Sequence, residues 1–86
     1  MPEISRFLGI VIAMYYNDHA PPHFHARYGD YEIRVAIETG EILSGSFPAR
    51  AQRMVLEWLD LHRAELVEDW HLAEERKPLF KIEPLE

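Results

Sequence analysis

Hydrophobic residues change their spacing once along the chain, near residue 48. Before that point they form short runs and alternations typical of strands, and after it they recur at every third or fourth position, as in a helix. The spacing predicts an α+β fold, with an antiparallel sheet of about four strands within residues 8–47. A helical region over 48–77 covers one face of that sheet, and an extended tail over 78–86 crosses the surface.

The first predicted strand is the apolar run from Leu8 to Tyr15. This run is rich in β-branched residues and is too short for a buried helix. A loop over residues 16–22 follows, because its Asn-Asp pair favours a turn and its Pro-Pro pair can continue neither a ladder nor a helix. Proline also favours an extended conformation in the residue before it, so we expect this loop to be stiff.

Two hairpins are predicted next, around the turn signals Gly29-Asp30 and Thr39-Gly40. Counting outward from Gly29-Asp30 pairs His25 with Arg34 and separates two sets of side chains, because strand residues alternate between faces. The apolar face comprises Phe24, Ala26, Tyr28, Tyr31, Ile33, Val35 and Ile37. The polar face comprises His23, His25, Arg27, Glu32 and Arg34.

The helical pattern continues without interruption from residue 49 to residue 77, since no Gly or Pro occurs there. It predicts either one long helix or two helices with a bend near His62. Both tryptophans belong to the apolar stripe and are expected in the core. The stripe consists of Ala51, Val55, Trp58, Leu59, His62, Leu66, Trp70 and Ala73.

Length and charge limit the classes of function. Eighty-six residues make a single domain, 1–86, whose small core would gain from self-association, as a homo-oligomer, or from a partner protein. The net charge is −6 with no basic stripe, which argues against tight nucleic-acid binding and leaves RNA as a transient substrate only. The absence of cysteine and of any apolar stretch of about 20 residues predicts a cytoplasmic protein with no membrane partner.

The candidate chemistry is concentrated in a histidine- and proline-rich segment that contains His19, His23 and His25. A strand places His23 and His25 on one side, so both imidazoles can bind one metal ion, and His19 can approach from the loop as a third ligand. Three such ligands and an open position suit zinc or another divalent transition metal. The neighbouring cation of Arg34 opposes metal binding, so a carboxylate such as Asp18 or Glu32 would have to compensate.

Two other interpretations of the same segment remain open. His23 and His25 can act as the acid and base that cleave an RNA phosphodiester, with Arg34 stabilising the developing charge. Alternatively, His19 and His23 only hold the Pro-Pro loop against the strands, while His25 lies on a solvated face. Among other motifs, the chain has no Gly-rich phosphate loop, so no cofactor-binding residues of that kind are predicted.

The residues of this segment also carry a family resemblance. The motif from Asp18 to His25, with its sequence Asp-His-Ala-Pro-Pro-His-Phe-His, resembles the domain-of-unknown-function 4160 family. Matching positions extend over essentially the whole chain and include Glu57-Trp58, His62-Arg63, Trp70 and Ile82-Glu83-Pro84-Leu85. The resemblance implies a prokaryotic protein encoded beside a small cognate protein, in gene pairs that look like toxin–antitoxin modules. Some relatives are loosely labelled transcriptional regulators, and no mechanism is implied.

The residues and the resemblance together predict the toxin-like component of such a pair. It would act through His23 and His25, assisted by His19, on RNA or through a bound divalent metal. The alternative is a non-catalytic interaction module or regulator that binds a partner protein. The first prediction requires that the two imidazoles project together from a strand onto a sheet face that the helix leaves uncovered.

Overall fold

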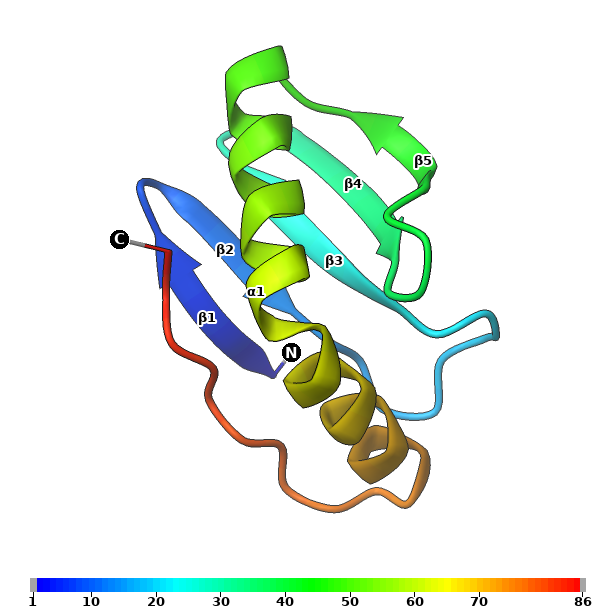
Figure 1. Ribbon diagram of the computed structural model, residues 1–86. Coiled ribbons are helices and arrows are strands. Elements are labelled where there is room, and N and C mark those ends of the chain that lie inside the picture. Colours follow the sequence, from blue (N-terminus) through cyan, green and yellow to red (C-terminus); the bar gives the residue numbers. More distant parts are fainter. Residues whose placement is uncertain (1, 86) are drawn as a thin grey trace.

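The structure is a computed structural model that describes residues 2–85. Within this range a five-stranded antiparallel sheet, in the order β1-β2-β3-β4-β5, is covered on one face by a single long helix (Figure 1). The α+β class predicted from the spacing is confirmed. The strands are β1 (Glu3–Phe7), β2 (Ile10–Ala13), β3 (His23–Tyr28), β4 (Tyr31–Ala36) and β5 (Ile42–Ser46), and the helix is α1 (Ala49–Glu74).

The sheet has one strand more than predicted, because β1 precedes the predicted range of 8–47. Its alternation is interrupted by a register shift between Glu3 and Ser5, so that Ile4 and Ser5 are both buried. A two-residue turn at Leu8 and Gly9 joins β1 to β2, and leucine is not a residue that signals such a turn. Because of these two features, the spacing of hydrophobic residues does not indicate β1.

The predicted pairing of β3 with β4 is confirmed at every position, including His25 with Arg34. The second hairpin differs from its prediction. Its connection occupies residues 37–41 rather than the two residues Thr39-Gly40, and the pairing of β4 with β5 shifts between Arg34 and Val35. The Ala36 amide donates to the Glu41 carbonyl at 2.9 Å and closes this wider loop.

Gly45 in β5 is required by the close approach of β4. Its φ of 83° lies in the left-handed region, and a Cβ there would overlap the backbone carbonyl of Glu32. Gly45→Ala should therefore lower the free energy of unfolding by at least ~2 kcal/mol, measured by urea denaturation. Gly29→Ala is the matched control, because Gly29 also has positive φ (58°) but has open space around it. Equal losses for the two variants would contradict the close approach at Gly45.

Helix α1 combines the two predicted alternatives, since it is continuous but kinked at His62 (φ −125°, ψ 23°). Arg63 fixes the kink to the connection between β4 and β5, because its Nε donates to the Ile37 carbonyl at 2.9 Å. Among the described residues, no helix is long and apolar enough to cross a membrane. The kink changes the direction of the helix and carries its second half towards the start of β3 (Figure 1).

The core lies between α1 and the sheet and is completed by the tail. Trp58 is fully buried, with its ring 5.7 Å from those of Phe7 and Phe24. The tail was predicted to cross the surface, but Ile82 is only 4% exposed and its amide donates to the Ile4 carbonyl at 2.8 Å. The Trp58 Nε1 donates to the carbonyl of Glu83 at 2.8 Å. The tail is thus part of the core.

A buried carboxylate holds the beginning of this tail. Asp69 of α1 is 1% exposed, and its Oδ1 accepts the amide of Phe80 at 2.9 Å. Burial raises the pKa of Asp69, the Phe80 hydrogen bond opposes that change, and the charges of Glu68 and Glu65 add to it. The net result is a pKa above the ordinary value.

Candidate functional site

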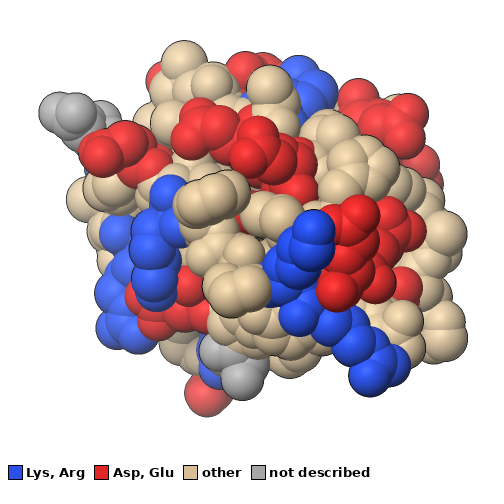
Figure 2. Space-filling view, turned by 90° about the horizontal axis from the view of Figure 1, so that it is seen from below, with Lys and Arg blue, Asp and Glu red and all other residues tan. Residues whose placement is uncertain are grey.

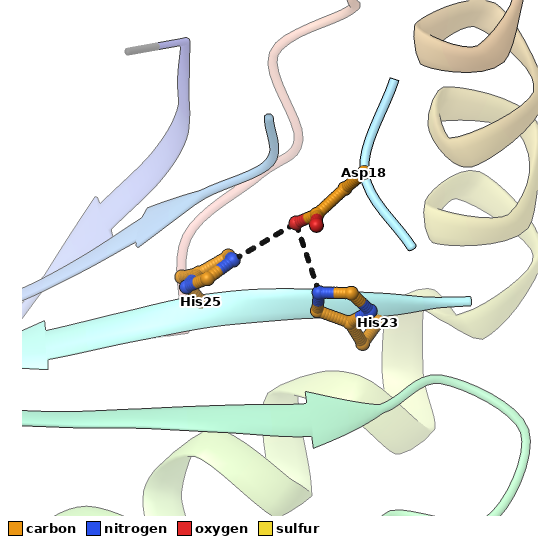
Figure 3. A group of neighbouring side chains, drawn as sticks. All are labelled: Asp18, His23 and His25. Atoms are coloured by element: carbon orange, nitrogen blue, oxygen red, sulfur yellow. Dashed lines mark hydrogen bonds and ion pairs between the residues drawn. The ribbon is translucent and has the colours of Figure 1, made fainter. Parts of the chain in front are cut away.

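Asp18, His23 and His25 come together where the loop between β2 and β3 passes over the start of β3 (Figure 3). One carboxylate oxygen, Asp18 Oδ2, lies 3.0 Å from His23 Nε2 and 3.3 Å from His25 Nε2. The two imidazole rings are 5.3 Å apart between centroids. The prediction that both imidazoles project together from one strand is therefore confirmed.

The local sequence explains this convergence. His23 and His25 occupy alternate positions of β3 and therefore point to the same side of the sheet. The loop reverses at Asn17, whose φ of 57° suits asparagine, and this turn directs Asp18 back towards the strand. The other oxygen of Asp18, Oδ1, accepts the amide of His19 at 2.8 Å, which fixes the orientation of the carboxylate.

The Nδ1 atom of each imidazole lies beside a hydrogen-bond acceptor. His23 Nδ1 lies 2.7 Å from the carbonyl oxygen of Pro21, and His25 Nδ1 lies 3.3 Å from Glu32 Oε2. A carbonyl or carboxylate can only accept, so each Nδ1 carries the proton. In a neutral imidazole the Nε2 then has a lone pair, and both lone pairs point at the Asp18 carboxylate, which is itself an acceptor. A metal ion bound between the three atoms would satisfy all of them, and so would N–H groups on the Nε2 atoms.

The site is more enclosed than predicted. The side chain of His23 is only 1% exposed, and its ring lies 5.3 Å from that of Trp70, on the second half of α1. His25 is 15% exposed and Asp18 is 19% exposed, with Tyr15 packed edge-on against His25 at 4.4 Å. The expectation of an open face is therefore wrong for His23, because the kinked helix and the loop enclose it. Access is through His25 and Asp18.

The charge of Asp18 is set by opposing effects. Burial alone would raise its pKa, but the His19 amide, the hydrogen bond with His25 and the charge of His23 together lower the pKa below its ordinary value. Asp18 is consequently ionised at neutral pH, as a metal ligand must be.

Two predicted site residues are not in this group. His19 is exposed and contributes its backbone amide rather than its ring. Arg34, the cross-strand partner of His25, leans towards β5 and donates from Nε to Ser44 Oγ at 2.8 Å. Its predicted catalytic role stays a prediction. The carboxylates Asp18 and Glu32 take the compensating positions beside His25 that the cation of Arg34 made necessary.

Two of the three separations between the donor atoms match those of a metal site, and all three donor atoms lie within 4.8 Å of one another. Two ligands that are each about 2.0–2.1 Å from one ion, at roughly tetrahedral or octahedral angles, lie about 2.8–3.4 Å from each other. The separations of Asp18 Oδ2 from the two Nε2 atoms fall in that range. Metal-binding histidines also usually donate the other ring N–H to a carbonyl or carboxylate, as His23 and His25 do. The residues present therefore fit a divalent transition metal.

The comparison with family models identifies the chain's relatives. The model described as "Domain of unknown function (DUF4160)" matches residues 9–71. The chain belongs to the DUF4160 family. The matched part of this DUF4160 protein contains Asp18, His23 and His25 and excludes β1 and the tail. Neither the curated proteins nor the solved structures gave a match.

One face of the DUF4160 protein carries mixed charge. On the face seen in Figure 2, basic and acidic side chains are interspersed and form no continuous basic surface. Such a face lacks the cluster of cations that gives tight, autonomous binding to a phosphate backbone.

Proposed function

We propose that Asp18, His23 and His25 bind a divalent transition metal ion. One observation carries the proposal: two Nε2 atoms converge on a single carboxylate oxygen while both Nδ1 atoms are held by acceptors. Imidazole and carboxylate ligands suit zinc and iron(II) better than magnesium or calcium, which prefer oxygen alone. Zinc is the first ion to test.

An ion held by three protein ligands keeps positions for water and for a substrate. Held by Asp18, His23 and His25, a divalent ion would supply Lewis-acid chemistry, lowering the pKa of water and polarising a phosphoryl or carbonyl oxygen. His25 and Asp18, which are partly exposed, give that ion its access to solvent. RNA remains the substrate class that we propose for such a centre, encountered transiently because the chain is acidic.

Calorimetric titration of metal-free protein without a His-tag tests the metal site. The parent should bind one zinc ion per chain, and Asp18→Asn or His25→Ala should weaken binding by at least ~100-fold. His71→Ala is the matched control, because the side chain of His71 is 68% exposed and pairs with Glu74 rather than with the group. His19→Ala should also bind normally. Unchanged affinity in both Asp18→Asn and His25→Ala would refute the proposed ligands.

The biological role that we propose follows from the family resemblance. The protein acts in the prokaryotic cytoplasm as the toxin-like component of a two-gene pair, and a small cognate protein from the adjacent gene neutralises it. The Asp18–His23–His25 group supports this role, because among residues 2–85 it is the one cluster of three or more titratable side chains that could hold a metal ion.

Induced expression in a bacterial host tests the toxin-like role. Cells that express the parent should stop growing, and cells that express His25→Gln should grow normally. The substitution removes the accessible imidazole and leaves the buried His23 contacts in place. His71→Gln should remain inhibitory. A parent that does not inhibit growth, or a His25→Gln variant that inhibits it equally, would exclude this role.

One observation favours the alternative of a non-catalytic interaction module or regulator. His23 Nδ1 holds the Pro21 carbonyl and His23 is buried, which is how a purely structural histidine stabilises a loop. The titration with zinc separates the two functions, since a group whose role is only to hold the loop binds no metal.

A further inference from the structure

A groove lined by both apolar and polar atoms lies at the other end of β3 from the Asp18–His23–His25 group, with Arg50 among its lining residues. It has a volume of about 280 Å³ and lies between the β1–β2 turn, the end of β3 and the first turns of α1. We call it the Leu8–Arg50 groove. Its lining residues are Leu8, Tyr28, Pro48, Arg50, Ala51 and Met54.

The groove collects large apolar side chains that the fold does not bury. Leu8 is 62% exposed and Tyr28 is 37% exposed, and Tyr31, the cross-strand partner of Tyr28, is 48% exposed. A small monomeric protein seldom exposes several such side chains side by side. Tyrosine and arginine are also the residues enriched at the centres of protein–protein interfaces.

Leu8 has an unfavourable backbone conformation and a side chain that the fold leaves exposed. Its φ of 51° and the φ of 82° at Gly9 define a turn in which asparagine or glycine would be relaxed and leucine is strained. A leucine in this position gains nothing from burial, because most of its side chain is in solvent. A contact with another molecule would bury this side chain and offset the strain of the turn.

The start of α1 is unfavourable in the same way. Pro48 provides no side-chain cap, the first turn contains no acidic residue, and Arg50 and Arg53 add positive charge to the positive end of the helix dipole. Among residues 2–85, no carboxylate forms an ion pair with either arginine, although the chain has a net charge of −6. This end of the molecule therefore presents unneutralised positive charge beside exposed apolar surface.

We propose that the Leu8–Arg50 groove docks a partner protein through a segment that presents apolar side chains flanked by carboxylates. Apolar side chains of the partner fill the groove between Leu8 and Tyr28, and its carboxylates pair with Arg50, Arg53 and the free amides of the first helical turn. The strained leucine and the uncapped basic helix start weaken the free protein and are compensated in the complex. A groove walled by Leu8, Tyr28 and Met54 suits a protein segment rather than a phosphate backbone.

Titration of ¹⁵N-labelled protein with a synthetic peptide of leucine and glutamate tests the groove. The peptide should shift the amide signals of Leu8, Tyr28 and Arg50 and leave those of His23 and His25 unchanged. Two control peptides, with lysine in place of glutamate or serine in place of leucine, should give no such shifts. Equal binding of the lysine peptide, or shifts that do not involve the groove, would overturn the proposal.

Leu8→Asn and Arg50→Glu separate binding from folding. Both should leave the melting temperature equal to or above that of the parent, because one relaxes the turn and the other favours the helix dipole, and both should weaken peptide binding by at least ~10-fold. Arg76→Glu, a charge reversal at an exposed position beyond the other end of α1, should bind normally. Normal binding by both groove variants would overturn the proposal. A lower sedimentation coefficient for Leu8→Asn than for the parent would also overturn it, because the groove of the parent would then hold a second copy of the chain.

Discussion

Trp58→Ala is expected to leave the protein largely unfolded at 25 °C. Trp58 is fully buried, contacts both Phe7 and Phe24, and holds the tail through the hydrogen bond to the Glu83 carbonyl. Truncation of a buried tryptophan costs about 3–5 kcal/mol, and a domain of this size is stabilised by about the same amount. Far-ultraviolet circular dichroism and urea denaturation measure the loss.

Trp58→Phe separates the two contributions of this residue. Phenylalanine retains part of the packing and removes the indole N–H, so the variant should fold with a stability between those of the parent and Trp58→Ala. A Trp58→Ala protein with the same unfolding midpoint as the parent would show that α1 and the tail do not share one core.

Zinc at about 100 times its dissociation constant should raise the melting temperature of the parent by more than about 10 °C. A ligand that binds only the folded state adds about 2.7 kcal/mol at that concentration, and 1 kcal/mol shifts the melting temperature of a small domain by about 4–8 °C. The increase arises because Asp18 lies in the loop between β2 and β3 while both histidines lie in β3, so the ion ties the loop to the sheet. Differential scanning calorimetry provides the measurement.

At the same zinc concentration Asp18→Asn should show an increase of at most about 3 °C, because it retains an acceptor for the His19 amide but loses the charge, and zinc binding that is ~100-fold weaker adds only about 0.4 kcal/mol. Magnesium should leave the parent unchanged, since imidazoles are poor ligands for it. An equal increase with zinc in the parent and in Asp18→Asn would place the ion elsewhere on the protein.

The sequence determines the middle of the sheet better than its edges. The register of β3 with β4 could be predicted because Gly29-Asp30 fixes the turn and the apolar face is continuous. β1 could not be found, because a register shift removes its alternation and Leu8 is an unusual turn residue. The buried tail also escaped prediction, since one isoleucine and a tryptophan N–H, rather than a pattern, place it in the core.

For the candidate site, spacing predicted which imidazoles converge but not how enclosed they are. His23 and His25 were identified from their alternate positions, whereas the burial of His23 depends on Trp70 and on the kink at His62. Asp18 was anticipated only as a carboxylate that the site would need, and the turn at Asn17 brings it there. A turn residue followed by an aspartate, a Pro-Pro pair and two alternate histidines is the signal that predicts this ligand set.

Anomalous diffraction at the zinc absorption edge, from crystals of untagged protein grown with zinc, tests the metal site most directly. The expected result is one peak about 2.0–2.2 Å from His23 Nε2, His25 Nε2 and an Asp18 carboxylate oxygen. Electron density in which those atoms stay in direct contact with no ion between them, while zinc binds only at His62 or His71 or not at all, would contradict the metal centre.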